Sequence, residues 1–347
     1  MKQYKSLDLA KFVSAILIII LHTAPFATYS NVLNFGFRNI ITVIAVPFFF
    51  LTSGFLAFKK IDSLEKGKRN AYVFQYLKRI TVMYLIWTAV YFVFVVIKWT
   101  RGDFSIFSVL EYIKDFFFEG SYSTIWFLPA LFGAILIVYL LHKRISYTSI
   151  FTIFCFVYLF TLGGSSYYGL VTDVPFIKAV YDAYYSFFDS IKNAVCFGGI
   201  FVSMGAMVAE REEAITKSTT AKKAIVPVII CAILLAVEEF LVAYFGWNDK
   251  GVDTVIMLVP FTYFFVRFLL CWNVNISDST CVAMRKYSIL MFLTQRIPLS
   301  IMTMFFAETI IVQNSMLYFA FILFSTILIS FLILKASKKI SWLRFAY

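Results

Sequence analysis

Long apolar runs, separated by short polar connections that contain Lys and Arg, follow one another along the whole chain. Each run is close to the ~20 residues that a helix needs to cross about 30 Å of hydrocarbon. The runs predict about ten membrane-spanning helices, at 9–28, 40–58, 80–98, 125–141, 148–163, 189–209, 224–244, 252–271, 287–306 and 315–334. The pattern therefore predicts an all-α, polytopic integral membrane protein, with residues 1–347 forming a single membrane domain.

Composition supports the membrane class. Hydrophobic residues make up 61% of the chain and charged residues 14%, whereas a soluble domain carries about 25% charge. The net charge of +12 lies in the short connections rather than in one basic patch, so it does not indicate a nucleic-acid partner. The lipid bilayer is the expected surrounding, and the cell membrane is the expected location.

The distribution of basic residues predicts the orientation. With the N-terminus placed in the cytoplasm, 21 Lys and Arg residues lie on the inner side and 7 on the outer side. Basic residues concentrate in cytoplasmic loops, so both termini are expected to face the cytoplasm. A cleaved signal peptide with its apolar core at 12–21 is the alternative. It is disfavoured because removal of this segment would spoil the charge distribution.

Two longer segments fall on the outer side, at 99–124 and 164–188. The second is rich in Gly, Ser and Tyr. Tyr together with small polar residues can bind sugar-like ligands, but an interfacial loop that caps the helices fits equally well. Both interpretations stay open from the sequence alone.

No metal centre is expected. The five Cys residues are scattered without CxxC spacing, and the chain has only two His residues. No Gly-rich phosphate loop and no GxSxG nucleophile elbow occurs, which argues against an ATP-driven pump and a serine hydrolase. No bound cofactor is therefore predicted.

Lys11 and His22 are the most informative polar residues of the first span. They are eleven positions apart, close to three helical turns, so they share one helix face about 16 Å apart. An ionisable residue inside a span is costly and is a functional candidate. Neutral imidazole can remove a proton from a hydroxyl group, so His22 is a candidate general base. The competing interpretations are that Lys11 reaches the cytoplasmic surface and that His22 bonds a neighbouring helix.

Other polar residues in or beside the spans are candidates for supporting roles. At least one of the two adjacent acids of the seventh span should face other helices, where it could orient His22 or pair with an Arg. Structural ion pairing is the simpler interpretation. An acid three residues before Lys11 is placed to pair with it. The candidates are Asp8, Trp126, Glu238, Glu239, Arg267 and Arg296.

The opening segment LDLAKFVSAILIIILHTAPF resembles the first helix of the acyltransferase 3 family of membrane acyltransferases, which carries a basic residue, ten intervening residues and then His. Four later segments resemble the same family in the same order: PFFFLTSGFLAFKK, YLKRITVMYLIW, IWFLPALFGAILIVYLL and RKYSILMFLTQRIP. Together they extend over roughly residues 7–335. The ordered set of five is more specific than the Lys–His spacing alone.

The resemblance implies an O-acyltransferase that takes an acyl group, most often acetyl, from cytoplasmic acyl-CoA. The acceptor would be a hydroxyl of a cell-surface glycan, a lipid-linked saccharide or another envelope molecule. His22 would be the general base, and Lys11, Lys78 and Arg79 would bind the coenzyme A phosphates. The chain departs from the family pattern at Gln295, where many members have His, and at the adjacent Lys78 and Arg79, where spaced Arg residues are frequent.

Other function classes remain as alternatives. A transporter or exporter of a glycan or small solute would also use Lys, His, Glu and Arg inside spans. The resemblance and the lack of obvious inverted repeats favour the enzyme. A non-catalytic membrane sensor, or the membrane part of a protein resembling amino-acid racemases, is a third possibility. The lack of a soluble racemase domain weighs against that last form. Neither the acceptor, the acyl chain nor the oligomeric state follows from the sequence.

Overall fold

A computed structural model describes residues 3–252 and 254–347, which form helices and no strand. The first half of the chain contains α1 (Lys5–Thr23), α2 (Asn31–Phe35), α3 (Ala45–Asp62), α4 (Lys66–Lys98), α5 (Ile106–Phe118), α6 (Phe127–His142) and α7 (Tyr147–Gly163). The second half contains α8 (Tyr168–Val171), α9 (Pro175–Tyr185), α10 (Gly199–Ser218), α11 (Ala221–Tyr244), α12 (Leu258–Cys271), α13 (Asp278–Thr294), α14 (Arg296–Phe305), α15 (Ile310–Gln313) and α16 (Ser315–Ala336).

Short π and 3-10 segments join or extend these helices. They are η1 (Gly36–Ile41), η2 (Thr42–Ile44), η3 (Trp99–Asp103), η4 (Ser123–Trp126), η5 (Ala194–Gly198) and η6 (Ser341–Ala346). In the described residues, 8 continuous helical segments are long and apolar enough to cross a membrane, and α7 and α12 are shorter apolar helices. These helices confirm an all-α multi-pass membrane protein. The count of ten spans and the orientation stay predictions.

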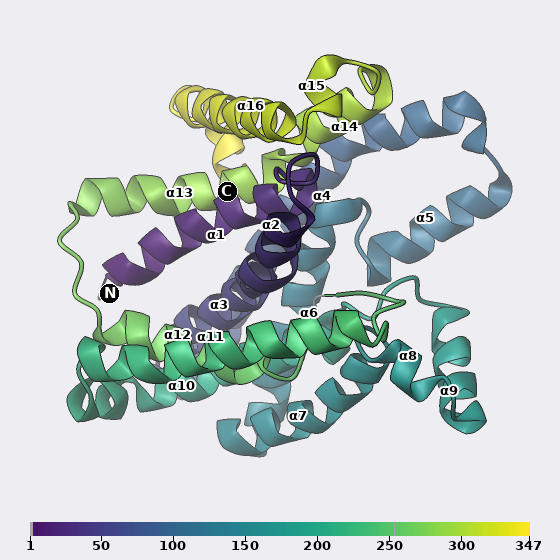
Figure 1. The fold of residues 1–347 in the computed structure, drawn as a ribbon. Helices are drawn as coiled ribbons and strands as arrows, with labels where there is room; N and C mark the ends of the chain where they lie inside the picture. Colours follow the sequence, from purple (N-terminus) through teal and green to yellow (C-terminus); the bar gives the residue numbers. More distant parts are fainter. Residues whose placement is uncertain (1–2, 253) are drawn as a thin grey trace. The chain divides into compact units, whose positions relative to one another are not determined.

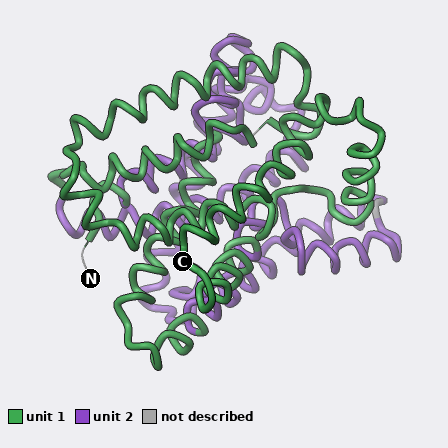
Figure 2. Tube along the Cα trace, turned by 90° about the horizontal axis from the view of Figure 1, so that it is seen from below, with its two compact units in different colours: residues 1–7, 43–74, 130–276 green, residues 8–42, 75–129, 277–347 purple. Residues whose placement is uncertain are grey.

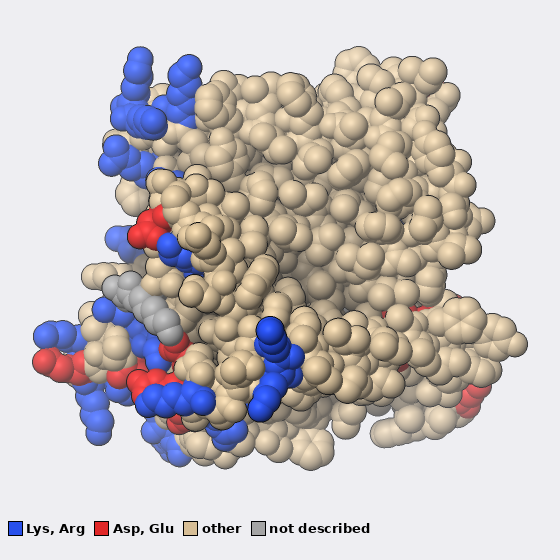
Figure 3. All heavy atoms as spheres, turned by 60° about the vertical axis from the view of Figure 1, so that its left-hand side comes forward, with Lys and Arg blue, Asp and Glu red and all other residues tan. Residues whose placement is uncertain are grey.

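The helices fall into two compact units (Figure 2). Unit 1 comprises Met1–Leu7, Val43–Phe74 and Ala130–Ile276, and unit 2 comprises Asp8–Thr42, Gln75–Pro129 and Ser277–Tyr347. Most of the surface displayed in Figure 3 carries neither basic nor acidic side chains, as expected for helices that face lipid.

Unit 1 is organised around α10, which packs against α3 and α7, while α12 packs against α10 and α11 (Figure 1). The crossing of α3 and α10 is close because it is lined by glycine. A Cβ atom on Gly205 would collide with the Leu51 carbonyl oxygen, and one on Gly54 would lie 2.5 Å from that of Val202. Small residues let helix backbones approach closely in lipid, where helices associate through packing.

In unit 2, α13 and α14 both pack against α16. The last turn of α5 and the segment after it are hydrogen-bonded to α4: Tyr84 donates to the Phe116 carbonyl oxygen at 2.7 Å and accepts from the Ser121 amide at 2.8 Å. The Trp87 indole donates to the Ala346 carbonyl oxygen at 3.0 Å, which anchors η6 on α4.

The ends of several helices differ from the predicted ends for local reasons. The predicted span 9–28 ends at Thr23, because the chain turns at Ala24 and Pro25. The predicted span 287–306 is divided into α13 and α14 at Gln295. The predicted span 252–271 becomes helical only at Leu258, and its residue 253 lies outside the described residues.

Candidate functional site

The first helix carries the two residues singled out by the Lys–His spacing. Both Lys11 and His22 lie on α1, inside unit 2. Lys11 is buried, with 9% of its surface exposed, and His22 is half-buried in the last turn of the helix. With about 1.5 Å of rise per residue, the two lie about 16 Å apart along one helix face. α1 thus brings a cation and an imidazole onto one face, at two depths.

Asp8 does not pair with Lys11 but with Arg285 of α13. The Arg285 guanidinium donates from Nε to Asp8 Oδ1 at 3.0 Å and from Nη2 to Oδ2 at 2.7 Å. This is the bidentate arrangement in which planar guanidinium and carboxylate groups match. The Asp8 side chain is 6% exposed and that of Arg285 is 46% exposed. The carboxylate side of the pair is therefore buried, whereas the guanidinium side is partly exposed.

The Lys11 ammonium is left without a hydrogen bond or ion pair within the described part of the chain. The charges that act on it are those of Asp8 and Arg285. Asp8 and Arg285 cancel each other, so the three groups together retain one positive charge. A buried charge without a partner is costly, which makes this cluster a candidate site for an anion.

Lys78 and Arg79 are exposed on α4, which also belongs largely to unit 2. Arg79 Nη2 donates to the carbonyl oxygen of Tyr347 at 2.9 Å, so the guanidinium contacts the C-terminal segment. The three predicted phosphate-binding cations thus differ in setting: Lys11 is buried and unpaired, whereas Lys78 and Arg79 are on the surface.

A second polar group of unit 2 surrounds the break between α13 and α14. Gln295 is fully buried; its Nε2 donates to the Phe292 carbonyl oxygen at 3.1 Å, while its Oε1 has no partner in the described structure. Arg296 donates to the Ser123 hydroxyl. Tyr122 stacks on Tyr91 at 4.8 Å between ring centroids. The candidate Trp126 lies half-buried at the end of η4, three residues after Ser123.

The remaining predicted charges belong to unit 1. Glu238 accepts from the Tyr167 hydroxyl, from the Ile256 amide at 2.6 Å and from the Met257 amide at 2.7 Å. It therefore caps the chain that enters α12, and it forms no ion pair with Arg267. Arg267 lies over the Tyr263 and Phe264 rings, at 5.6 and 5.8 Å from their centroids.

Glu239, the residue after Glu238, is buried in unit 1 at 1% exposure. Tyr167, in the segment after α7, is the side chain that donates a hydrogen bond to Glu238. Burial raises the pKa of the Tyr167 hydroxyl, and the hydrogen bond to the Glu238 carboxylate raises this pKa further. The hydroxyl therefore stays protonated and remains a donor. Glu238 therefore accepts three hydrogen bonds from the chain around it.

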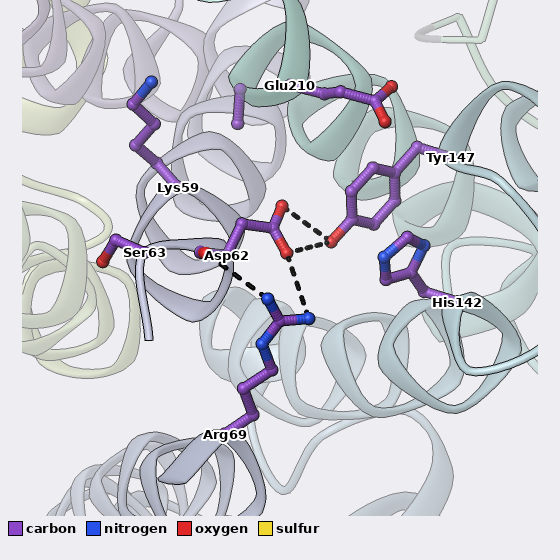
Figure 4. Close-up of a pocket in the computed structure, with 8 residues that line it drawn as sticks. Lys59, Asp62, Ser63, Arg69, His142, Tyr147 and Glu210 are labelled. Atoms are coloured by element: carbon purple, nitrogen blue, oxygen red, sulfur yellow. Dashed lines mark hydrogen bonds and ion pairs between the residues drawn. The ribbon is translucent and has the colours of Figure 1, made fainter. Parts of the chain in front are cut away.

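Unit 1 also contains a polar pocket that the sequence did not reveal (Figure 4). Its volume is about 500 Å³. The Tyr147 hydroxyl donates to both oxygens of Asp62, at 3.1 and 3.0 Å, and Arg69 Nη1 lies 3.9 Å from Asp62 Oδ1. The His142 ring stacks on Tyr147 at 3.7 Å. The eight lining residues are Lys59, Asp62, Ser63, Arg69, His142, Tyr147, Ala209 and Glu210.

The only sequence signal for this pocket was His142, the second His of the chain, beside the basic pair Lys143 and Arg144. Its partners come from four other helices, so a single sequence gives no reason to group them. The pocket combines basic and acidic side chains: Arg69 pairs with Asp62 within the lining, and Lys59 pairs with Glu212 outside it.

Comparison with known proteins identifies one matching family and several relatives. The family described as the acyltransferase domain matches residues 4–335. An amino-acid racemase of Enterococcus faecalis is 31% identical over 210 residues, covering 60% of this chain and 28% of that protein. A serine/alanine racemase of Enterococcus gallinarum is 26% identical over 345 residues, covering 98% of this chain and 47% of that protein.

A second amino-acid racemase of Enterococcus faecalis is 23% identical over 335 residues, covering 96% of this chain and 46% of the relative. The chain thus spans about half the length, or less, of the curated relatives that it matches. No solved structure matches it.

Proposed function

Because the chain belongs to the acyltransferase 3 family, we propose that it is a membrane O-acyltransferase that uses cytoplasmic acyl-CoA. The acyl group, acetyl in the simplest case, passes to a hydroxyl of a cell-surface glycan or lipid-linked saccharide at the cell membrane. His22 removes the hydroxyl proton as the acyl carbon is attacked, and coenzyme A leaves as the thiol. Lys11 binds donor phosphates, with Lys78 and Arg79 on the adjoining surface.

The observation that carries the proposal is the unpaired Lys11 ammonium on the same helix face as His22. An anion that satisfies Lys11 would place negative charge at the predicted cytoplasmic end of α1. The imidazole of His22 lies about 16 Å away along the helix, near the opposite end. The extended thiol arm of an acyl-CoA is a suitable ligand for a site whose cation and base are this far apart.

The direct test is acyl transfer in sealed membrane vesicles that contain the protein. Acetyl-CoA labelled in the acetyl group is supplied to the cytoplasmic face, and label is followed into glycan and lipid-linked saccharide. Vesicles without the protein, and vesicles with the His22→Gln protein at equal amount, are the controls. We expect label in the acceptor only with the parent protein. Equal labelling in all three preparations would refute the proposal.

A second candidate function is movement of an amino acid across the membrane. Two features favour it: the relatives are named amino-acid and serine/alanine racemases, and the pocket of unit 1 is lined by both bases and acids. A zwitterion presents a carboxylate and an ammonium, which such a lining can meet with opposite charges.

Uptake of labelled serine and alanine into the same vesicles distinguishes the two functions. Transport predicts uptake that depends on the protein, is abolished by Arg69→Ala and is unaffected by His22→Gln. Acyl transfer without amino-acid uptake would eliminate the second candidate. Uptake without acyl transfer to any acceptor would instead eliminate the first.

A further inference from the structure

The Asp8–Arg285 pair determines which charge remains available at Lys11. Asp8 and Lys11 are three residues apart on α1, and side chains at this spacing are neighbours on a helix surface. In the absence of another partner, Asp8 would therefore pair with Lys11. The structure shows a different pairing, because both Asp8 oxygens accept hydrogen bonds from Arg285, 277 residues away in the sequence.

We infer that Arg285 is a positioning residue of the donor site, and that it acts by taking Asp8 away from Lys11. Its two bonds hold the carboxylate and cancel its charge, so Lys11 keeps its positive charge for a phosphate of the donor. The inference rests on the proposed acyl-CoA site and adds a residue that the Lys–His spacing does not contain. Arg285 acts through Asp8 and needs no contact with the ligand.

The geometry explains why this role requires Arg. A guanidinium donates two parallel hydrogen bonds in a fixed plane, whereas an ammonium is a point charge that cannot occupy both carboxylate oxygens in this way. Burial of the Asp8 side chain also keeps water from screening its charge. Without Arg285, that charge would act on Lys11 and on any anion beside it.

The test measures coenzyme A affinity by calorimetry in the purified full-length protein. Arg285→Ala should weaken binding by about tenfold or more, because Asp8 then pairs with Lys11 and repels phosphate. Asp8→Asn should tighten binding, because it removes the acid. The double variant Arg285→Ala with Asp8→Asn should recover most of the loss. Lys286→Ala, which removes a neighbouring exposed positive charge from the same helix, is the matched control and should change affinity less than twofold.

The double variant separates this role from a structural one. Asp8→Asn removes the charge that Arg285→Ala leaves uncompensated, so it restores binding if that charge causes the loss, whereas a structural defect from the loss of Arg285 would persist. The inference is overturned if Arg285→Ala binds like the parent or if the double variant stays as weak as Arg285→Ala. If the parent itself binds no coenzyme A, the proposed donor and this inference both fail.

Discussion

The two units each contain a buried acid with a basic partner, but the net charge of the two clusters differs. In unit 1, Glu212 is 4% exposed; it accepts from Lys59 Nζ at 2.8 Å and from the Tyr4 hydroxyl at 2.9 Å. In unit 2, Asp8 is similarly buried and accepts two bonds from Arg285, but Lys11 stands beside this pair without a partner. A balanced cluster serves the fold, whereas a cluster with a charge left over is available to a ligand.

The backbone of unit 2 also contains a strained turn. Among the described residues, the glycines with positive φ are Gly246 in unit 1 and Gly102 and Gly120 in unit 2, where such a conformation costs little because glycine has no Cβ atom. In unit 2, the turn that follows His22 is at Ala24, with φ of 46°, the one non-glycine residue with positive φ among those described. Strain in the backbone is often found at functional sites. Unit 2 thus contains both an unpaired charge in the first half of α1 and a strained turn directly after its last residue.

The largest expected effect is on catalysis. His22→Gln should lower the rate of acyl transfer by about 10²- to 10⁴-fold, because the amide cannot act as a base near neutral pH. Coenzyme A affinity should change little, since His22 lies about 16 Å from Lys11 along the helix. Single-turnover transfer and calorimetry on the same preparation measure the two quantities. A parental transfer rate would show that His22 is not the base.

The second effect concerns the unpaired cation. Lys11→Met keeps an unbranched side chain of similar size and removes its charge. A charge-assisted hydrogen bond contributes roughly 1.5–3 kcal/mol, so coenzyme A affinity should fall by about 10- to 150-fold. Arg79→Ala should have a smaller effect, because Arg79 is exposed and contacts Tyr347. Lys178→Met, in an exposed ion pair of unit 1, is the control. Equal losses of affinity in Lys11→Met and Lys178→Met would show that the unpaired charge of Lys11 has no specific role in binding coenzyme A.

The sequence predicted an all-α membrane protein because hydropathy reports directly on transfer into lipid, and it predicted that Lys11 and His22 share one helix because their spacing lies within one apolar run. It could not predict the partner of Asp8. The nearest basic residue along α1 is Lys11, while Arg285 is brought close only by the packing of α13 in unit 2. The amphipathic helices α5 and α9 were not predicted either, because with 13 and 11 residues they are shorter than a span and lie in the more polar segments 99–124 and 164–188.

The role of Glu238 was also beyond the sequence. Two adjacent acids in a span indicated an ion pair with an Arg, which is the simplest way to stabilise a carboxylate in lipid. The structure instead stabilises Glu238 with backbone amides before α12 and with the Tyr167 hydroxyl. Such bonds depend on the path of the loop between α11 and α12, which one-dimensional hydropathy does not describe.

The third prediction tests the balanced cluster. Glu212→Gln leaves the partly exposed Lys59 without its acid partner and should destabilise the protein by about 2 kcal/mol. The cost is less than for a fully buried pair because Lys59 is 36% exposed. Thermal unfolding in detergent measures the change. Glu65→Gln, which breaks the exposed pair with Lys68, should cost less than about 0.5 kcal/mol. Coenzyme A affinity of the folded Glu212→Gln protein should be parental; a loss would mean that this cluster also serves the ligand.

The smallest effect is expected at the strained turn. Ala24→Gly removes the contact that a Cβ atom makes at positive φ, a cost of about 1–2 kcal/mol, but it also increases the freedom of the unfolded chain. The net change should be a stabilisation of about 0.5–1 kcal/mol, seen as a higher unfolding midpoint. Ala27→Gly, in the same turn but with negative φ, should destabilise the protein, since it gains only the unfolded-state freedom.

If the strain at Ala24 serves to hold the His22 ring in place, acyl transfer by Ala24→Gly should slow several-fold while coenzyme A affinity stays parental. A stabilised variant with parental transfer would show that the strained turn is independent of the reaction.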